Sequence, residues 1–170
     1  MTIIKGGPDG LLHIRAPKPL ILDIMIFDTL SLIPTLNGIM NHVILLGHLS
    51  IRVLRLTTRE INPQSLTDFV GKILHLEEVE FHGLISRPKE FFDDLAGPPP
   101  SAKTQLINKK PICTSLKTFR LHIPPIASST AEKAMMKWFR KAVEARKKGM
   151  YPIEEAFYWK TDLEIWVPVL

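Results

Sequence analysis

Residues 51–56 read IRVLRL and carry apolar side chains at their first, fourth and sixth positions. The same spacing recurs in LEEVEF at 76–81 and LKTFRL at 116–121, and in weaker form in IEEAFY at 153–158 and ILDIMI at 21–26. Side chains alternate between the two faces of a strand, so the fourth and sixth positions point the same way. The pattern therefore predicts a series of short strands, each with one buried face.

Amphipathic helices are predicted between these strands. In residues 36–44, 64–74 and 130–148, apolar side chains recur at i, i+3, i+4 and i+7, which places them on one helical face. Residues 88–95 form a shorter candidate helix. Strands that alternate with helices in this way run parallel and are joined by right-handed crossovers.

The expected fold class is α/β: a short, irregular leucine-rich-repeat-like solenoid of about five parallel strands with helices on one face. Residues 157–167, FYWKTDLEIWV, are able to fold back as a C-terminal hairpin. One domain is expected over residues 21–170. Residues 1–20 are expected to be a loop or partial repeat, and the proline-rich residues 97–111 a loop insertion, because glycine and proline punctuate both segments.

The chain has 170 residues, with 22 Lys and Arg against 17 Asp and Glu, which gives a net charge of +5. Its hydrophobic content of 45% excludes disorder of the whole chain. The single cysteine, Cys113, excludes an internal disulfide and a cysteine-cluster zinc site. Residues 29–51 carry no Asp, Glu, Lys or Arg, but Asn, His, Pro and Gly interrupt them, so no membrane span is expected. An intracellular location, cytoplasmic or nuclear, is expected because no signal peptide is visible.

Three segments carry a resemblance to a known family: LHLEEVEFHG at 74–83, SLKTFRLHI at 115–123 and KWFRKAVEARKKGMYPIEEAFYW at 137–159. They resemble the C-terminal leucine-rich-repeat region of fungal (basidiomycete) F-box-like proteins. The last segment is the most specific, since a basic helix ending in ARKKG is followed by Tyr-Pro and a strand. The resemblance implies a degenerate leucine-rich-repeat fold that is used for protein recognition.

In family members that carry an F-box, this box recruits a cullin-RING ubiquitin ligase and the repeats bind the substrate. Here the first predicted repeat strand already starts at Ile21, and no F-box is visible before it. We therefore expect ligase components as partners only if an F-box lies upstream, in which case the chain is a fragment. A truncated gene product and a repeat-only relative are the alternatives. The expected function is a protein-interaction module, in its specific form the recognition of a ubiquitin-ligase substrate.

The strand residues between the apolar positions are expected to point out of the curved sheet. Their middle row is predicted to contain Arg55, Glu80 and Arg120 side by side, a favourable ladder of opposite charges, with Met25 and Phe157 at its ends. Arginine and aromatic residues are frequent hot spots of protein interfaces. The candidate binding residues of this concave face are Met25, Phe27, Arg55, Thr57, Glu78, Glu80, His82, Arg120, His122, Phe157 and Trp159. The alternative is a solvated sheet with paired charges.

No enzymatic activity, metal or cofactor is expected. His82 and His122 are predicted neighbours, but a metal site needs three or four convergent ligands. Cys113 has no general base fixed near it, and a lone cysteine is usually a small buried hydrophobic residue. The sequence contains neither a phosphate-binding loop nor a specified pair of catalytic carboxylates. The expected partner is therefore a protein, whose identity the sequence does not specify.

The positive charge is concentrated in one predicted helix. Residues 130–148 carry seven Lys and Arg and two Glu, a net charge of +5, so the rest of the chain sums to zero. The alternative function is therefore nucleic-acid or membrane-surface binding through the outward face of this helix, formed by Lys133, Lys137, Arg140, Lys141 and Lys148. Nucleic acid is not the expected partner, because Trp138 and Phe139 fall on the apolar stripe, where a core role is predicted.

Overall fold

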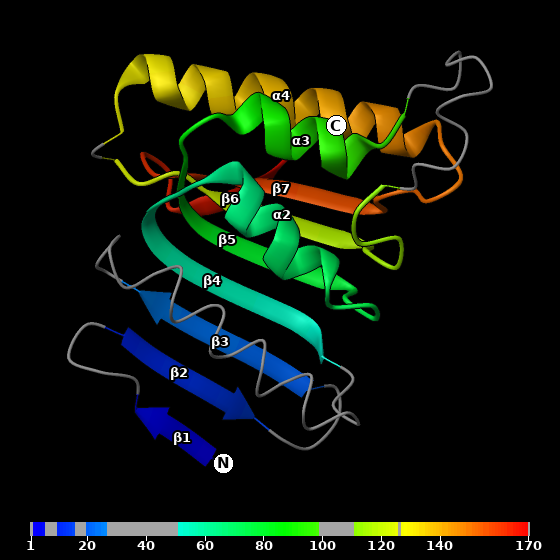
Figure 1. The fold of residues 1–170 in the computed structure, drawn as a ribbon. Coiled ribbons are helices and arrows are strands. Elements are labelled where there is room, and N and C mark those ends of the chain that lie inside the picture. The colour runs from blue at the N-terminus through cyan, green and yellow to red at the C-terminus, as the bar shows by residue number, and fades with distance from the viewer. Residues whose placement is uncertain are drawn as a thin grey trace.

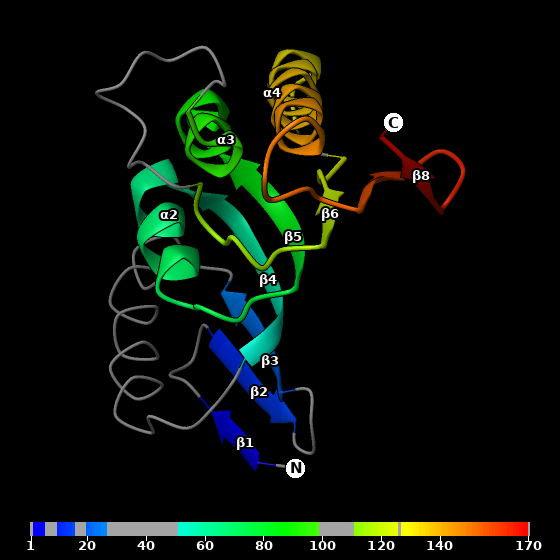
Figure 2. The same cartoon turned by 90° about the vertical axis from the view of Figure 1, so that its right-hand side faces the viewer.

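A computed structural model describes residues 2–5, 10–15, 20–26, 51–98, 111–125 and 127–169. They form one eight-stranded sheet in which the strands lie side by side in chain order (Figure 1). The strands are β1 (Thr2–Lys5), β2 (Gly10–Arg15), β3 (Leu20–Ile26), β4 (Ile51–Ile61), β5 (Glu78–Ile85), β6 (Thr118–His122), β7 (Glu155–Lys160) and β8 (Ile165–Pro168). The described helices, which pack side by side on one face of the sheet (Figure 2), are α2 (Pro63–Gly71), α3 (Pro88–Ala96) and α4 (Ser129–Lys147).

The centre of the sheet is parallel and its two ends are antiparallel. Strands β3 to β7 run parallel, each beside the next. The β1–β2, β2–β3 and β7–β8 pairs are antiparallel. The predicted α/β class, the parallel strands with helices on one face and the C-terminal hairpin are therefore confirmed.

Strands β5, β6 and β7 each start two residues after their apolar stretch begins, whereas β4 starts together with its stretch at Ile51. Leu76, Leu116 and Ile153 occupy the first position of three stretches, and all three are buried ahead of β5, β6 and β7. The side chain at the first position packs into the core from the segment before the strand. Within the strand, the fourth and sixth positions then supply the buried side chains of its inner face.

Backbone hydrogen bonds join equivalent positions of successive stretches. Bonds of 2.8 Å run from Glu77 N to Arg52 O, from Lys117 N to Glu77 O and from Glu154 N to Lys117 O. Each of the four residues that these bonds join occupies the second position of its stretch. The stretches are therefore stacked by translation along the sheet, although 25 to 40 residues separate their starting points.

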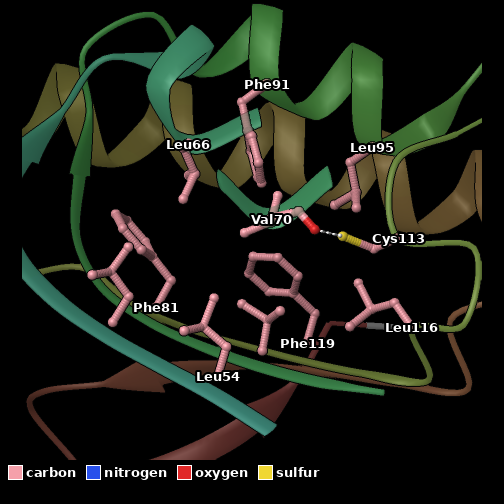
Figure 3. A pocket seen from close by; sticks show the side chains of 11 residues that line it. Leu54, Leu66, Val70, Phe81, Phe91, Leu95, Cys113, Leu116 and Phe119 are labelled. Carbon is pink, nitrogen blue, oxygen red and sulfur yellow. Dashed lines mark hydrogen bonds between the residues drawn. The ribbon is translucent and has the colours of Figure 1, made fainter. Parts of the chain in front are cut away.

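The apolar side chains that face the helices form two continuous rows across the strands. The rows are Leu54, Val79, Phe119 and Ala156, and Leu56, Phe81, Leu121 and Tyr158. Together with α2 and α3 they enclose an apolar cavity of about 10 Å³ (Figure 3), which is about the space of one water molecule. Between these rows and the helices α2 and α3, the described residues thus form a closely packed core in which this cavity is too small for a ligand.

Cys113 is part of this core. Its Sγ lies 3.4 Å from the carbonyl oxygen of Val70, to which the thiol donates a hydrogen bond (Figure 3). Burial raises the pKa of the Cys113 thiol to about 12, against a smaller opposing effect of the Arg146 charge. The expectation of a small buried hydrophobic residue is confirmed, because such a thiol is not ionised at neutral pH.

Strands β4 and β5 approach each other unusually closely at Gly83. Their register shifts between Thr57 and Glu60, and Gly83 lies opposite this shift with a φ of 153°. A Cβ atom at Gly83 would collide with the carbonyl oxygen of Thr58. Glycine is required here both by the backbone conformation and by the space.

Gly83→Ala is therefore expected to lower the free energy of unfolding by at least about 2 kcal/mol, the cost of a strained backbone plus the displaced strand. Urea unfolding measures the change. Gly149→Ala is the matched control, since a Cβ at Gly149 meets only ordinary contacts of 3.4 Å. Equal stabilities of the two variants would contradict the close approach of the strands.

The predicted loop in residues 1–20 is wrong for β1 and β2. TIIK and GLLHIR each contain two adjacent aliphatic residues, which favour strands, and the two segments pair in antiparallel orientation. The glycines and prolines that suggested a loop fall mostly between these two runs and after them. They were turn signals, and the interpretation as one continuous loop overlooked the short strands.

Other predictions fall on residues that the structure leaves undescribed. They are the helix at 36–44, the proposed binding residue Phe27 and most of the loop insertion at 97–111, of which residues 99–110 are outside. The uncharged segment 29–51 also lies outside, apart from its last residue. Among the described helices, none combines the length and the apolar character needed to cross a membrane.

Candidate binding face

The sheet surface opposite the helices, called the open face below, collects the predicted binding residues. The register aligns Arg55, Glu80, Arg120 and Phe157 in one row across four strands. Apart from the undescribed Phe27, the predicted residues share this surface, to which the structure adds Asp23 and Trp166. The open face comprises Asp23, Met25, Arg55, Thr57, Glu78, Glu80, His82, Arg120, His122, Phe157, Trp159 and Trp166.

On β3 the predicted row is shifted by two residues. Asp23, and not Met25, lies beside Arg55, while Met25 lies beside Thr57. Leu22 and Ile24 are the strand's buried residues. A shift of two residues leaves the alternation of buried and exposed side chains unchanged, so the apolar pattern does not distinguish the two registers.

The predicted charge ladder is only partly present. Arg55 lies between two carboxylates, with Nε 3.4 Å from Glu80 Oε2 and Nη1 3.8 Å from Asp23 Oδ1. Arg120 forms its ion pair with Glu78, diagonally across the strands, in place of the expected pair with Glu80. Its guanidinium also lies 5.8 Å from the centre of the Phe157 ring. All these groups are partly exposed, so each pair stabilises the fold by about 1 kcal/mol or less.

A hydrogen-bonded chain of three titratable side chains crosses β5 and β6. Glu80 Oε1 lies 2.7 Å from His82 Nε2, and His82 Nδ1 lies 2.8 Å from His122 Nδ1. The carboxylate accepts only, so His82 donates through Nε2 and keeps a lone pair on Nδ1. His122 then donates from its own Nδ1. The sequence analysis predicted these histidines as neighbours, and the structure adds their direct bond.

The environment shifts two pKa values of this chain. The hydrogen bond from His82 lowers the pKa of Glu80, assisted by the charges of His82, Arg55 and Arg120 and opposed by burial. Burial lowers the pKa of His122, assisted by the charge of His82 and opposed by Glu80. A neutral His122 beside an ionised Glu80 is therefore the favoured state at neutral pH.

Lowering the pH from about 8 to 5 is expected to destabilise the fold through His122. The pKa of His122 in the folded chain lies below its ordinary value of 6.5. As the pH falls through 6.5, the unfolded chain therefore binds more protons than the folded chain does, and the free energy of unfolding decreases. His122→Gln should remove this part of the dependence of the unfolding free energy on pH. Urea unfolding near pH 8, 6.5 and 5 tests this. The measurements stop at pH 5 because the pKa of Glu80, lowered here from its ordinary value of 4.5, lies below that pH.

His75→Gln, at an exposed turn, is the control for the removal of an imidazole as such. If His122→Gln shows the same slope of stability against pH as the unaltered chain, the lowered pKa of His122 is contradicted.

Two tryptophans complete an aromatic cluster with the histidines. The ring of Trp159 lies 5.7 Å from that of His122 and 5.3 Å from that of Trp166, whose ring is in turn 6.3 Å from that of His82. The two imidazole rings are 4.7 Å apart. Trp166 on β8 reaches His82 on β5 because the β7–β8 hairpin lies on the side of the sheet away from the helices (Figure 2).

Trp166 is the residue that sequence reasoning missed on this face. The hairpin was predicted from its sequence, but its curvature over the neighbouring strands was not. The predicted hairpin could have indicated Trp166, because Trp159 and Trp166 are directly opposite each other in the register of β7 and β8.

Beside the cluster the open face is hollowed. A depression of about 220 Å³ is lined by Asp23, Ile24, Met25, Arg55, Thr57, Glu80 and His82. This volume is smaller than that of ordinary small-molecule pockets, but it accommodates a single side chain of a partner.

The predicted basic face is present on α4. Its five residues, Lys133, Lys137, Arg140, Lys141 and Lys148, are all exposed. Trp138 differs from the expectation of a core residue, because it is only partly buried while Phe139 is fully buried.

Three lysines surround the Trp138 ring. The Nζ atoms of Lys141, Lys137 and Lys89 lie 4.7, 5.1 and 5.5 Å from its centre. Lys89 is also paired with Asp93 at 2.7 Å. The helix surface therefore combines cations with a partly exposed aromatic ring, which the helical pattern alone did not indicate.

Arg146, in contrast, is no part of this surface. The residue is 1% exposed, and within the described part of the chain its guanidinium donates hydrogen bonds to backbone carbonyl groups. The acceptors are the carbonyl oxygens of Leu95, Ile112, Cys113, Leu116 and Tyr151. Burial lowers the pKa of Arg146, with a smaller opposing effect of Cys113. Its role is structural, because it joins the end of α3, the turn before β6 and the segment after α4.

The chain was compared with models of protein families, with curated proteins and with solved structures, and none of the three comparisons found a match. Among the described residues, no set of three or more His, Cys, Asp or Glu side chains converges to hold a metal ion.

Proposed function

We propose that the chain is a leucine-rich-repeat-like solenoid that recognises a protein partner through its open face. The stacking of equivalent positions in successive stretches supports the solenoid. The single observation that carries the function is the cluster of Trp159, Trp166, His82 and His122 on the side of the sheet away from the core.

The chemistry of the open face suits a protein interface. Tryptophan and arginine contribute most often to hot spots, since they bury large areas and offer directed hydrogen bonds. Here Trp166 contacts His82, and His82 in turn lines the depression together with Arg55 and Met25. A partner side chain in that depression would meet the carboxylates of Asp23 and Glu80 and the guanidinium of Arg55, a lining of both charge signs that suits a polar residue.

The specific form of this proposal is substrate recognition of the F-box type in a ubiquitin ligase, and it rests on the resemblance of residues 74–83, 115–123 and 137–159. Cullin-RING components would join the complex only through an F-box on the same polypeptide. The open face would then bind the substrate.

The test is affinity capture from extract of the source organism with a variant that removes three open-face side chains, Arg55→Ala/Arg120→Ala/Trp159→Ala. Loss of the captured partner by this variant is the expected result. Lys133→Ala/Lys137→Ala/Lys141→Ala is the matched control on α4 and should retain the partner. If the open-face variant keeps every partner, the open face is not the recognition site.

A second candidate function is nucleic-acid binding through α4, favoured by the partly exposed Trp138 among three lysines. Cations that neutralise phosphates beside an aromatic ring that stacks on a base are the usual components of a single-strand binding surface.

Salt titration separates this second candidate from the first. Binding of a single-stranded oligonucleotide that weakens steeply with salt and is abolished by Lys137→Glu/Lys141→Glu would support it. Absence of binding at low salt would exclude it, while the recognition of a protein by the open face would be unaffected.

A further inference from the structure

The geometry points to a binding site for a divalent transition-metal ion at His82 and His122. The two Nδ1 atoms face each other at 2.8 Å on adjacent parallel strands. This inference does not depend on the proposed recognition function, because the isolated chain is sufficient to test it.

The distance between the two nitrogens is close to that of a shared metal. Imidazole nitrogens lie about 2.0–2.1 Å from zinc, so two of them at a tetrahedral angle are about 3.3 Å apart. To replace their mutual hydrogen bond by two metal bonds, the two imidazoles open by about half an ångström, with a tilt of the rings. The proton that His122 carries on Nδ1 is lost to solvent and its Nε2 takes one up, so that the ring stays neutral and its Nδ1 lone pair becomes free for the metal. Both side chains are partly exposed, so such a change does not require the core to move.

Glu80 already fixes the state of His82 that a metal needs. It accepts the Nε2 proton of His82 at 2.7 Å, which leaves the Nδ1 lone pair available. A carboxylate that holds the far nitrogen of a ligating imidazole is the usual outer partner of such a metal ligand, and it increases the basicity of the imidazole.

The chemistry of the donors selects the class of ion. Two imidazole nitrogens favour nickel, copper or zinc over magnesium and calcium, which prefer oxygen ligands. No third side chain converges among the described residues, so water completes the coordination sphere and the ion exchanges readily. Sequence reasoning dismissed a metal here on the number of ligands, and it had no access to the orientation that Glu80 imposes.

Tryptophan fluorescence provides a local readout. Trp159 and Trp166 are in ring contact with the two histidines, so a paramagnetic ion bound there quenches their emission. The chain has three tryptophans, and Trp138→Phe removes the one on α4. Titration of Trp138→Phe with Ni²⁺ is expected to give saturable quenching that a chelator reverses, that Mg²⁺ does not produce and that weakens as the pH is lowered and protons compete for the imidazoles.

Variants in this background test the assignment. His82→Gln and His122→Gln should each weaken binding at least tenfold, Glu80→Gln should weaken it about tenfold, and His75→Gln should not change it. NMR of imidazole nitrogens in the unaltered chain gives a second measurement that does not rely on variants, in which Ni²⁺ should broaden the signals of His82 and His122 first. Quenching that does not saturate, or that persists in His82→Gln/His122→Gln, would overturn the inference, as would broadening of other histidines first.

Discussion

Replacing Arg146 with methionine is expected to lower the free energy of unfolding by about 3–5 kcal/mol, the largest effect of any single charged residue described here. Methionine fills much of the volume but provides no donor. Four carbonyl oxygens in the interior would then lose their hydrogen-bond donor. They belong to Leu95, Ile112, Cys113 and Leu116 and lie 3.1 to 3.5 Å from the guanidinium nitrogens. Each buried acceptor that loses its donor costs about 1–3 kcal/mol unless water reaches it.

Arg146→Lys should recover only part of this loss. An ammonium group offers three donors from one point, whereas the planar guanidinium spreads five over a fork that reaches several chain segments. Arg140→Met, on the exposed side of the same helix, is the control and should change stability by less than about 0.5 kcal/mol. Urea unfolding of the three variants measures these effects. Stability of Arg146→Met within 1 kcal/mol of the unaltered chain would show that the carbonyl groups do not depend on the arginine.

Replacing Phe119 with alanine is expected to lower the free energy of unfolding by about 3–5 kcal/mol, the usual cost of removing a large aromatic side chain from a core. The Phe119 ring lies between β6 and the helices, 5.1 Å from the ring of Phe139 and 6.3 Å from that of Phe92. Its removal leaves a cavity at the point where the sheet meets both α3 and α4, and the rigid strands on either side limit collapse.

Phe157→Ala is the matched control for this substitution. Phe157 lies in the neighbouring strand but on the open face, where its recorded interaction is with the Arg120 guanidinium. Its loss should cost about 1 kcal/mol or less. Thermal unfolding distinguishes the two variants, and an equal decrease in melting temperature would mean that the two faces of the sheet are not a core and an open surface.

The periodicity of the sequence predicted the fold more completely than the register. Because the two faces of each strand alternate strictly, the apolar positions of IRVLRL, LEEVEF and LKTFRL were sufficient to separate a core face from an open face. The predicted register of β3 against β4 was wrong by two residues, because it placed Met25 beside Arg55, where the structure has Asp23. A shift by two residues keeps the same side chains on the buried face, so the apolar pattern does not reveal the error. The diagonal pair of Arg120 with Glu78 depends on side-chain rotamers, which no spacing rule specifies.

Arg146 was missed although its position was readable. It follows Met135, Phe139 and Ala142 at helical spacing, so it belongs to the buried stripe of α4 by periodicity alone. Its charge nevertheless argues against burial, because a buried arginine without a carboxylate partner is rare. The carbonyl groups that hold it come from α3 and from turns distant in sequence, which only the tertiary structure brings together.

Most residues of the open face were predicted from the sequence, but the contacts between their side chains were not. The sequence indicated that His82 and His122 are neighbours, whereas the Glu80–His82–His122 chain and the position of Trp166 follow from the orientation of side chains and from the curvature of the hairpin. These are the features on which the recognition function and the metal site are proposed.

The most direct test of recognition through the open face is site-specific cross-linking. A photo-reactive amino acid in place of Thr57, which lies within the depression of the open face, is compared with the same amino acid in place of Lys133 on the exposed side of α4. The account predicts that the partner retained in affinity capture is cross-linked at position 57 and not at position 133. Cross-linking of that partner at position 133 alone would contradict it.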